Sequence, residues 1–289
     1  MNRMNSVSES YIKSNLHTHS TFCDGKNTPE ENVIAAIQKN IRVLGFTSHS
    51  MFPFWTETYM HPEDFSSYCA EIHRLQKKYA GQITIRLGFE TDFIPGVSVP
   101  NIQNYAEFEP DYLIGSVHFI FQREGAFAVD YKTEILKNGA EKYYKNDIRS
   151  LICDYFSLQK EMLLKGDFAV LGHADLIRKF NEKSQFFDET EDWYKNELKE
   201  LASAVARAGI ATEINSGAIA RGYLSKPYPS EYFLSLLKEK GVPVAITADA
   251  HAEEMLDCDF ENSLLLAKKI GYTEVIYDID RAGYRFCSI

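Results

Sequence analysis

The chain alternates short apolar segments with helical patterns along most of its 289 residues. The strand-like segments are residues 14–19, 43–49, 83–93, 111–119, 168–176, 210–217, 243–251 and, more weakly, 274–278. Because strands that alternate with helices form parallel βα units, this order predicts a β/α barrel of seven or eight strands. Neither an internal repeat nor a linker interrupts the pattern, so residues 1–289 are expected to form a single domain.

Helix start and stop signals lie between these segments. Thr28-Pro29-Glu30-Glu31 combines a capping box with a proline in the first turn, which predicts a helix continuing through 33–39. Glycine at position 241 marks the end of an amphipathic stretch, as glycine commonly does after a helix. That stretch is 230–240, and the other helical stretches are 141–165 and 191–208.

The composition limits the compartment and the partners. A net charge of −10 opposes a general nucleic-acid surface, although bound cations could still attract an anionic substrate. The five cysteines are scattered without a C-x-x-C pair, which favours a reducing compartment over a disulfide framework. Residues 1–13 lack the apolar core of a signal peptide, and no apolar run reaches the roughly 20 residues of a membrane span. We expect a cytoplasmic protein with neither a membrane nor a nucleic-acid partner, in an oligomeric state that the sequence does not define.

Six of the eight histidines lie at the carboxyl ends of predicted strands, where the active sites of β/α barrels assemble. They are His17, His19, His49, His118, His173 and His251. A lone histidine is usually a satisfied structural residue, and this is the interpretation for His61 and His73, which lie in helical patterns. Six histidines at one rim are different, because their burial would leave many polar groups without partners. The set predicts a metal site.

The spacing of polar residues supports the same site. Side chains at positions i and i+2 of a strand share a face, and three pairs of metal-ligand type have this spacing. The pairs are His17/His19, Glu90/Asp92 and Asp249/His251, and Asp24 follows on the first loop. Six imidazoles with the carboxylates of Asp24, Glu90 and Asp249 could serve two or three divalent ions. This mixed set of nitrogen and oxygen ligands suits Zn²⁺, Mn²⁺ or Fe²⁺.

In this order the motifs resemble the PHP (polymerase and histidinol phosphatase) superfamily, from about residue 14 to residue 270. The shared motifs are His17-x-His19 with Asp24-Gly25, then His49, Glu90, His118, His173 and Asp249-x-His251. Segments 45–50, 88–93, 172–177, 213–217 and 228–230 resemble the histidinol-phosphate phosphatase branch. One departure is Ser48, where the wider superfamily often has an aspartate before the histidine.

The resemblance implies a distorted (β/α)7 TIM-like barrel with a trinuclear metal centre. By this resemblance Glu90 bridges two ions and Asp249 belongs to the first of them. The implied sets are His17, His19, Glu90 and Asp249, then Glu90, His118 and His173, and finally Asp24, His49 and His251. The implied activity is hydrolysis of L-histidinol phosphate to L-histidinol and phosphate, in histidine biosynthesis. Asp249 or His251 could protonate the leaving alkoxide, and a purely ligating role for each is the alternative.

Substrate contacts are expected from the loops. Phe52 and Trp55 lie in an aromatic loop, 51–60, that could form a wall against the imidazole or simply cover the barrel mouth. Asp92 could pair with the substrate ammonium or instead support a ligand. Arg178 and Arg221, shortly after strand ends, are candidate phosphate contacts, with structural salt bridges as the alternative.

Two other functions are compatible with the motifs. One is a PHP phosphoesterase acting on nucleotides or DNA ends, and the acidic composition weighs against long nucleic acids. The other is a catalytically idle, metal-stabilised scaffold. The complete ligand set argues against a scaffold, which has no need of open coordination positions.

Overall fold

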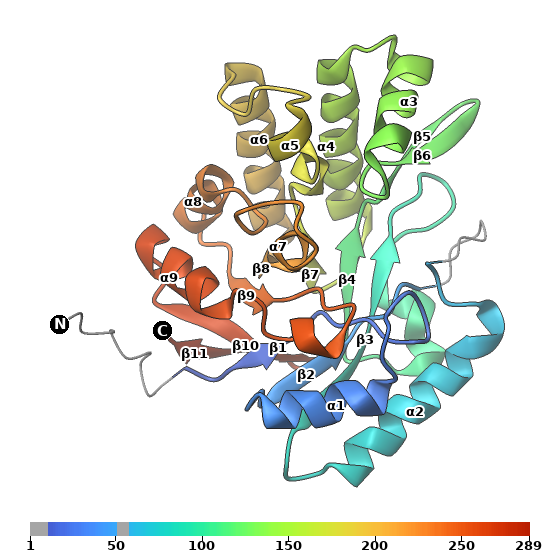
Figure 1. Ribbon diagram of the computed structural model, residues 1–289, viewed down its shortest axis with the longest axis vertical. Helices are drawn as coiled ribbons and strands as arrows, with labels where there is room; N and C mark the ends of the chain where they lie inside the picture. The colour runs from blue at the N-terminus through green and yellow to red at the C-terminus, as the bar shows by residue number, and fades with distance from the viewer. Residues whose placement is uncertain (1–10, 51–57) are drawn as a thin grey trace.

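The computed structural model describes residues 11–50 and 58–289, and within them the main sheet has nine strands (Figure 1). Their order is β1 (Ser14–Asn15), β2 (Val43–Phe46), β3 (Thr84–Asp92), β4 (Tyr112–Ser116), β7 (Val170–Leu171), β8 (Ala211–Asn215), β9 (Val244–Thr247), β10 (Glu274–Asp280) and β11 (Gly283–Ser288). All neighbouring pairs are parallel except β10 and β11, which are antiparallel.

The first strand meets the seventh at the carboxyl end of the sheet. Thr18, just after β1, pairs in parallel with Ala250, just after β9. The backbone N–H of His19 donates to the oxygen of Ala250 at 2.9 Å, and the N–H of Ala250 donates to the oxygen of His17 at 3.2 Å. Strands β1 to β4 and β7 to β9 therefore curl into a closed ring at this end. The predicted distorted (β/α)7 barrel is confirmed.

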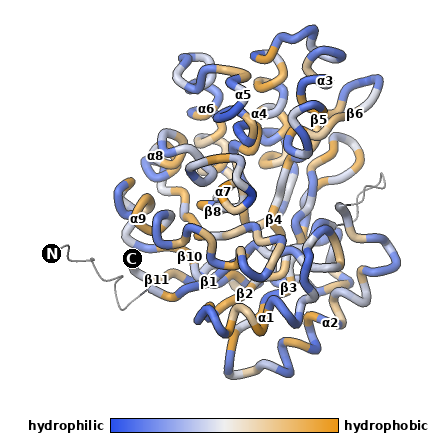
Figure 2. The backbone as a smooth tube through the Cα atoms, in the orientation of Figure 1, coloured by the Kyte–Doolittle hydropathy of each residue, from blue (hydrophilic) through white to orange (hydrophobic). Residues whose placement is uncertain are grey.

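Helices surround the strands, with α3 to α6 at one end of the molecule in Figure 1 and α1 and α2 at the other. Their bounds are α1 (Pro29–Gln38), α2 (Phe65–Lys78), α3 (Thr133–Tyr144), α4 (Ile148–Lys165), α5 (Asn181–Ser184), α6 (Asp192–Ala208), α7 (Gly217–Ala220), α8 (Glu231–Glu239) and α9 (Phe260–Ile270). Hydrophobic and hydrophilic stretches alternate along the tube of α2 and α9, as expected of helices with one buried face (Figure 2). Across residues 11–50 and 58–289, no helix combines the length and apolar character that a bilayer span requires.

The predicted capping box at the start of α1 is confirmed. The hydroxyl oxygen of Thr28 accepts from the backbone N–H of Glu31 at 3.3 Å, and a carboxylate oxygen of Glu31 accepts from the N–H of Thr28 at 2.8 Å. Both groups satisfy N–H donors that the helix itself leaves unpaired.

The single helical stretch predicted at 141–165 is wrong, because two helices occupy this part of the chain. Lys145 and Asn146 have φ angles of 53° and 65°, in the left-handed region, and they end α3. The carboxylate of Asp147 then accepts from the backbone N–H of Ser150 at 3.1 Å and begins α4. An asparagine tolerates the left-handed conformation better than most residues, and this is the local cause of the break.

Two strand pairings were not predicted from the sequence. An antiparallel hairpin of β5 (Phe119–Gln122) and β6 (Gly125–Ala128) projects between β4 and α3, and β11 extends the main sheet beyond β10. The observed barrel strands are also shorter than predicted. Most candidate ligands consequently lie on the loops just after the strands.

Candidate metal centre

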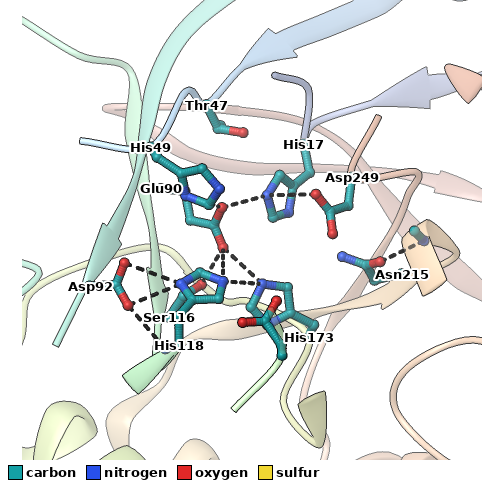
Figure 3. A network of polar contacts seen from close by, with 12 residues as sticks. His17, Thr47, His49, Glu90, Asp92, Ser116, His118, His173, Asn215 and Asp249 are labelled. Atoms are coloured by element: carbon teal, nitrogen blue, oxygen red, sulfur yellow. Dashed lines mark hydrogen bonds and ion pairs between the residues drawn. The ribbon is translucent and has the colours of Figure 1, made fainter. Parts of the chain in front are cut away.

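All nine predicted ligands gather at the carboxyl end of the barrel, and Figure 3 shows six of them, including the central Glu90. They come from the ends of β1, β2, β3, β4, β7 and β9 and are His17, His19, Asp24, His49, Glu90, His118, His173, Asp249 and His251. Seven of them are buried, and Asp24 and His251 are partly exposed. His61 and His73 lie elsewhere, at the start of a 3-10 turn and within α2 respectively.

Glu90 lies at the centre of the cluster, and its two carboxylate oxygens face different histidines (Figure 3). Oε2 is 3.2 Å from Nε2 of His17 and 3.1 Å from Nδ1 of His49. Oε1 is 2.8 Å from Nε2 of His173 and 3.4 Å from Nε2 of His118. A carboxylate with one oxygen in each of two histidine groups has the arrangement needed to bridge two ions.

The ligand atoms form three groups, within each of which all atoms lie within 4.8 Å of one another. The groups are His17, His19 and Asp249; His49, Glu90 and His118; and His19, Asp24, His49 and His251. Only the first group lies within one predicted ion set. The second adds His49 to Glu90 and His118, and the third adds His19 to Asp24, His49 and His251, so His19 and His49 each belong to two groups. The spacing is close enough for neighbouring ions to share ligands.

Several buried ligand atoms have no hydrogen-bond partner. They are Nε2 of His17, Nε2 of His19, Oδ1 of Asp24, Nδ1 of His49 and Oε2 of Glu90. Buried side-chain nitrogen and oxygen atoms in proteins nearly always have a partner. Here the unpaired lone pairs are those of imidazole nitrogens and carboxylate oxygens directed at the same space. The donor set therefore fits two or three divalent cations, which would satisfy these atoms together.

Two histidines of the cluster have pKa values shifted in opposite directions. Burial, followed by the neighbouring His251 and His49, lowers the pKa of His19 to about 3. Burial also opposes charge on His118, but Asp92 and then Glu90 outweigh it and raise the pKa of His118 to about 10. Because a histidine ligates a metal in its neutral form, an ion that binds His118 would displace a proton.

A carboxylate that the sequence interpretation did not assign, Glu213 on β8, lies beneath the cluster. Its Oε2 is 2.9 Å from Nδ1 of His17 and accepts from the Thr247 hydroxyl at 2.7 Å. Its Oε1 accepts from the backbone N–H of His173 at 2.8 Å. Glu213 thus orients two ligand residues, since the second ring nitrogen of a ligating histidine commonly contacts a carboxylate. The signal was present in the sequence, because Glu213 and Asn215 have the same i, i+2 spacing as the assigned pairs.

Substitution of Glu213 by glutamine should weaken metal binding without abolishing it. The amide keeps the shape but removes the negative charge next to His17, and loss of such a support typically costs about 10- to 100-fold in metal affinity. Titration of the metal-free protein with Zn²⁺ measures the change. Glu239→Gln, at an exposed position on α8, is the matched control and should bind as the wild type does. Wild-type affinity in Glu213→Gln would mean that Glu213 does not support the ligands.

The position of Asp92 does not suit the first role predicted for it, binding of the substrate ammonium. Its Oδ1 lies 3.0 Å from Nδ1 of His118 and accepts from the backbone N–H of His118 at 3.0 Å. Its Oδ2 accepts from the Tyr59 hydroxyl. The side chain is buried behind His118 and does not line the cavity next to the ligands. The geometry favours the alternative role, in which Asp92 orients His118.

A cavity of about 550 Å³ opens beside the ligand cluster. Its lining includes several of the ligands and the apolar side chains of Phe119, Phe127, Ile135 and Leu176. Three further charged groups, Asp130, Lys179 and Arg221, line the same cavity. The volume and the mixed lining suit a small organic phosphate.

Of the two arginines predicted to contact phosphate, only Arg221 reaches this cavity. Its Nη2 is 3.0 Å from Oδ2 of Asp249, and its Nη1 is 3.0 Å from Nδ1 of His251. The contacts of Arg178 favour the alternative stated for it, a structural salt bridge. Its Nε donates to Glu189 at 2.7 Å and its Nη1 lies 3.5 Å from Asp175, so the guanidinium is held in an ion-pair network away from the ligands.

Of the other predicted substrate and catalytic residues, the two aromatic ones lie outside the described part of the chain and the two candidate acids lie within the ligand cluster. Phe52 and Trp55 lie outside the described residues, whereas Tyr59, near the end of the same loop, lines the cavity with its ring centroid 5.0 Å from that of His49. Asp249 and His251 contact other ligands, with Asp249 Oδ1 at 3.1 Å from His19 Nε2. Their ligating role is compatible with these contacts, and a role as general acid stays a prediction.

The comparisons with known proteins agree with this geometry. A model of the PHP domain family matches residues 15–217. A protein from Deinococcus radiodurans named probable histidinol-phosphatase is 28% identical, over 90% of this chain and 95% of its own length. The histidinol-phosphatase of Bacillus subtilis is 24% identical, over 81% of this chain and 92% of its own length.

A solved structure shares the fold. The histidinol phosphate phosphatase of Lactococcus lactis, complexed with zinc, L-histidinol and phosphate, superimposes with a TM-score of 0.73 at 20% identity. The match covers 95% of this chain and 99% of that one.

Proposed function

Because the chain belongs to the PHP domain family, we propose that it is a metal-dependent phosphomonoesterase that hydrolyses L-histidinol phosphate to L-histidinol and phosphate. The observation that carries the proposal is the convergence of six histidines and three carboxylates beside a cavity of about 550 Å³. The relatives named histidinol-phosphatase support the choice of substrate, and they match the chain over most of its length.

The proposed cofactors are two or three divalent ions held by the nine ligand residues. Zinc in the Lactococcus lactis structure supports this class of ion, with Mn²⁺ and Fe²⁺ as alternatives. When bound, such ions lower the pKa of water and neutralise charge on a phosphoryl group, which are the two needs of phosphomonoester hydrolysis. Cytoplasmic location and the absence of a nucleic-acid partner belong to the same proposal and rest on the composition.

The residues of the chain supply the remaining steps. Arg221 would give its free donors to the phosphate, since the guanidinium lines the cavity and its Nε has no hydrogen-bond partner. Glu213 and Asp92 would hold His17 and His118 in their ligating orientations. Asp249 or His251 would deliver a proton to the leaving oxygen, because both lie where the ligand cluster meets the cavity.

The substrate is tested by comparing phosphate release from L-histidinol phosphate with release from a panel of nucleoside monophosphates, using protein loaded with Zn²⁺ or Mn²⁺. We expect kcat/KM to be at least about tenfold higher for L-histidinol phosphate, because the apolar side chains and the charged groups of the cavity fit a small amino-alcohol ester. Equal or faster turnover of a nucleotide would favour the alternative PHP phosphoesterase and overturn the proposed substrate. Absence of turnover on every ester would favour a metal-stabilised scaffold.

A further inference from the structure

One carboxylate of the cavity stands apart from the ligand cluster. Asp130 lies on the segment between the β5–β6 hairpin and α3, and its side chain is 22% exposed. Among the described residues that line the cavity, the other carboxylates are Asp24, Glu90 and Asp249, each a candidate metal ligand. Among the described carboxylates of the cavity, Asp130 is thus the one that is neither a candidate metal ligand nor a support for a ligand.

The partner of Asp130 is a lysine that is nearly inaccessible. Nζ of Lys179 lies 3.2 Å from Oδ2 of Asp130, and the lysine side chain is only 9% exposed. The same ammonium lies 4.9 Å from the centroid of the Tyr223 ring. Lysines are rarely buried without an ionic partner, so Asp130 compensates the Lys179 charge in the free protein.

Asp130 is also within electrostatic reach of the metal centre. Burial raises its pKa, but Lys179, then His118 and His173, outweigh burial and lower the pKa of Asp130 below its usual value. The side chain is therefore an anion. It lies next to the ligand cluster, because the backbone N–H of the preceding residue, Val129, donates to the oxygen of His118 at 2.9 Å and Asp130 lines the same cavity as His118 and His173. A group bound to it would lie beside a phosphate held at that cluster.

The substrate of the proposed function carries opposite charges on a short skeleton. Its phosphate is an anion, and its ammonium is separated from the phosphate ester oxygen by two carbons. The carboxylate predicted to hold this ammonium, Asp92, is already engaged by His118 and Tyr59 and does not line the cavity. The cavity nevertheless offers an anion, at Asp130, and its lining also contains the apolar Phe119, Phe127 and Ile135, which suit an uncharged ring.

We propose that Asp130 is the residue that recognises the ammonium group of the substrate, exchanging its ion pair with Lys179 for one with the ligand. This inference rests on the proposed function and deepens it, because it assigns the residue that selects an amino-alcohol ester over other phosphate esters. The exchange keeps Asp130 paired, and it leaves the Lys179 ammonium beside an anionic ester. The cavity thereby compensates both charges of the substrate and neither charge is buried alone.

The test compares two substrates that differ only in the ammonium. They are L-histidinol phosphate and its deamino analogue, 3-(imidazol-4-yl)propyl phosphate, and the measured quantity is the ratio of their kcat/KM values. In Asp130→Asn, which keeps the size of the side chain and removes the charge, this ratio should fall by about 10- to 100-fold, mainly through KM for L-histidinol phosphate. The control Asp154→Asn, at an exposed position on α4, should keep the wild-type ratio.

The outcomes separate this inference from the proposed function. A ratio in Asp130→Asn equal to that of the wild type would overturn the inference, even if both activities fell, because a purely structural role lowers them together. Wild-type protein that hydrolyses the two esters equally well would overturn it too. Wild-type protein that releases no phosphate from L-histidinol phosphate, while it hydrolyses another ester, would overturn the proposed function and this inference with it.

Discussion

Replacing Glu90 by glutamine should reduce kcat/KM for L-histidinol phosphate by about a thousandfold or more. The two oxygens of Glu90 face different histidine groups, and the side chain is 1% exposed, so no solvent charge can replace it. An amide of the same shape offers a weaker ligand on one side and an N–H donor on the other. The negative charge of the Glu90 carboxylate between two ions would then be lost, and the repulsion between the two positive ions would be less well balanced.

Metal content and activity should fall together in this variant. Elemental analysis is expected to find fewer ions per chain in Glu90→Gln than in the wild type, while the circular dichroism spectrum shows a folded protein. Glu239→Gln, an exposed glutamate at the end of α8, should keep both values and controls for the loss of one negative charge. Full activity of Glu90→Gln with all its metal would mean that the ligand assignment is wrong.

Removal of the ions by a chelator should abolish activity and also destabilise the fold. In the metal-free cluster Glu90, Asp249 and Asp24 converge with several buried lone pairs that have no partner. Ions present at 1,000 times their Kd stabilise a protein by about 4 kcal/mol. For a chain of this size that corresponds to a decrease in Tm on the order of 10 °C after chelation.

Thermal unfolding with and without a chelator measures this effect. Protein with Glu213→Gln should show a smaller decrease, because it binds the ions less tightly before the chelator is added. An unchanged Tm after verified removal of all metal would show that the ions do not stabilise the barrel. Retained activity in the same sample would contradict metal-dependent hydrolysis.

The barrel and the ligand cluster could be predicted from the sequence because both follow from periodic patterns. Alternation of apolar segments and helical patterns identifies the parallel strands, and the carboxyl ends of parallel strands meet at one edge. Residues as far apart in the chain as His17 and Asp249 could therefore be placed together before any contact was known.

Features set by local backbone conformation or by competing partners were harder to predict. The break between α3 and α4 depends on Lys145 and Asn146 adopting left-handed φ angles inside a pattern that reads as helical throughout. The roles of Arg178 and Asp92 depend on which neighbouring side chains form ion pairs or hydrogen bonds with them. Glu189 engages Arg178 and His118 engages Asp92, and neither choice is encoded in the spacing along one strand.

If the nine-residue cluster hydrolyses L-histidinol phosphate with bound divalent ions, turnover must follow metal occupancy in a single titration. Metal-free protein is titrated with Zn²⁺ or Mn²⁺ while phosphate release from L-histidinol phosphate is followed against ions bound per chain. We expect negligible turnover without metal and full turnover only when two or three ions are bound. Full turnover by the metal-free protein, or none at full occupancy, would contradict this expectation.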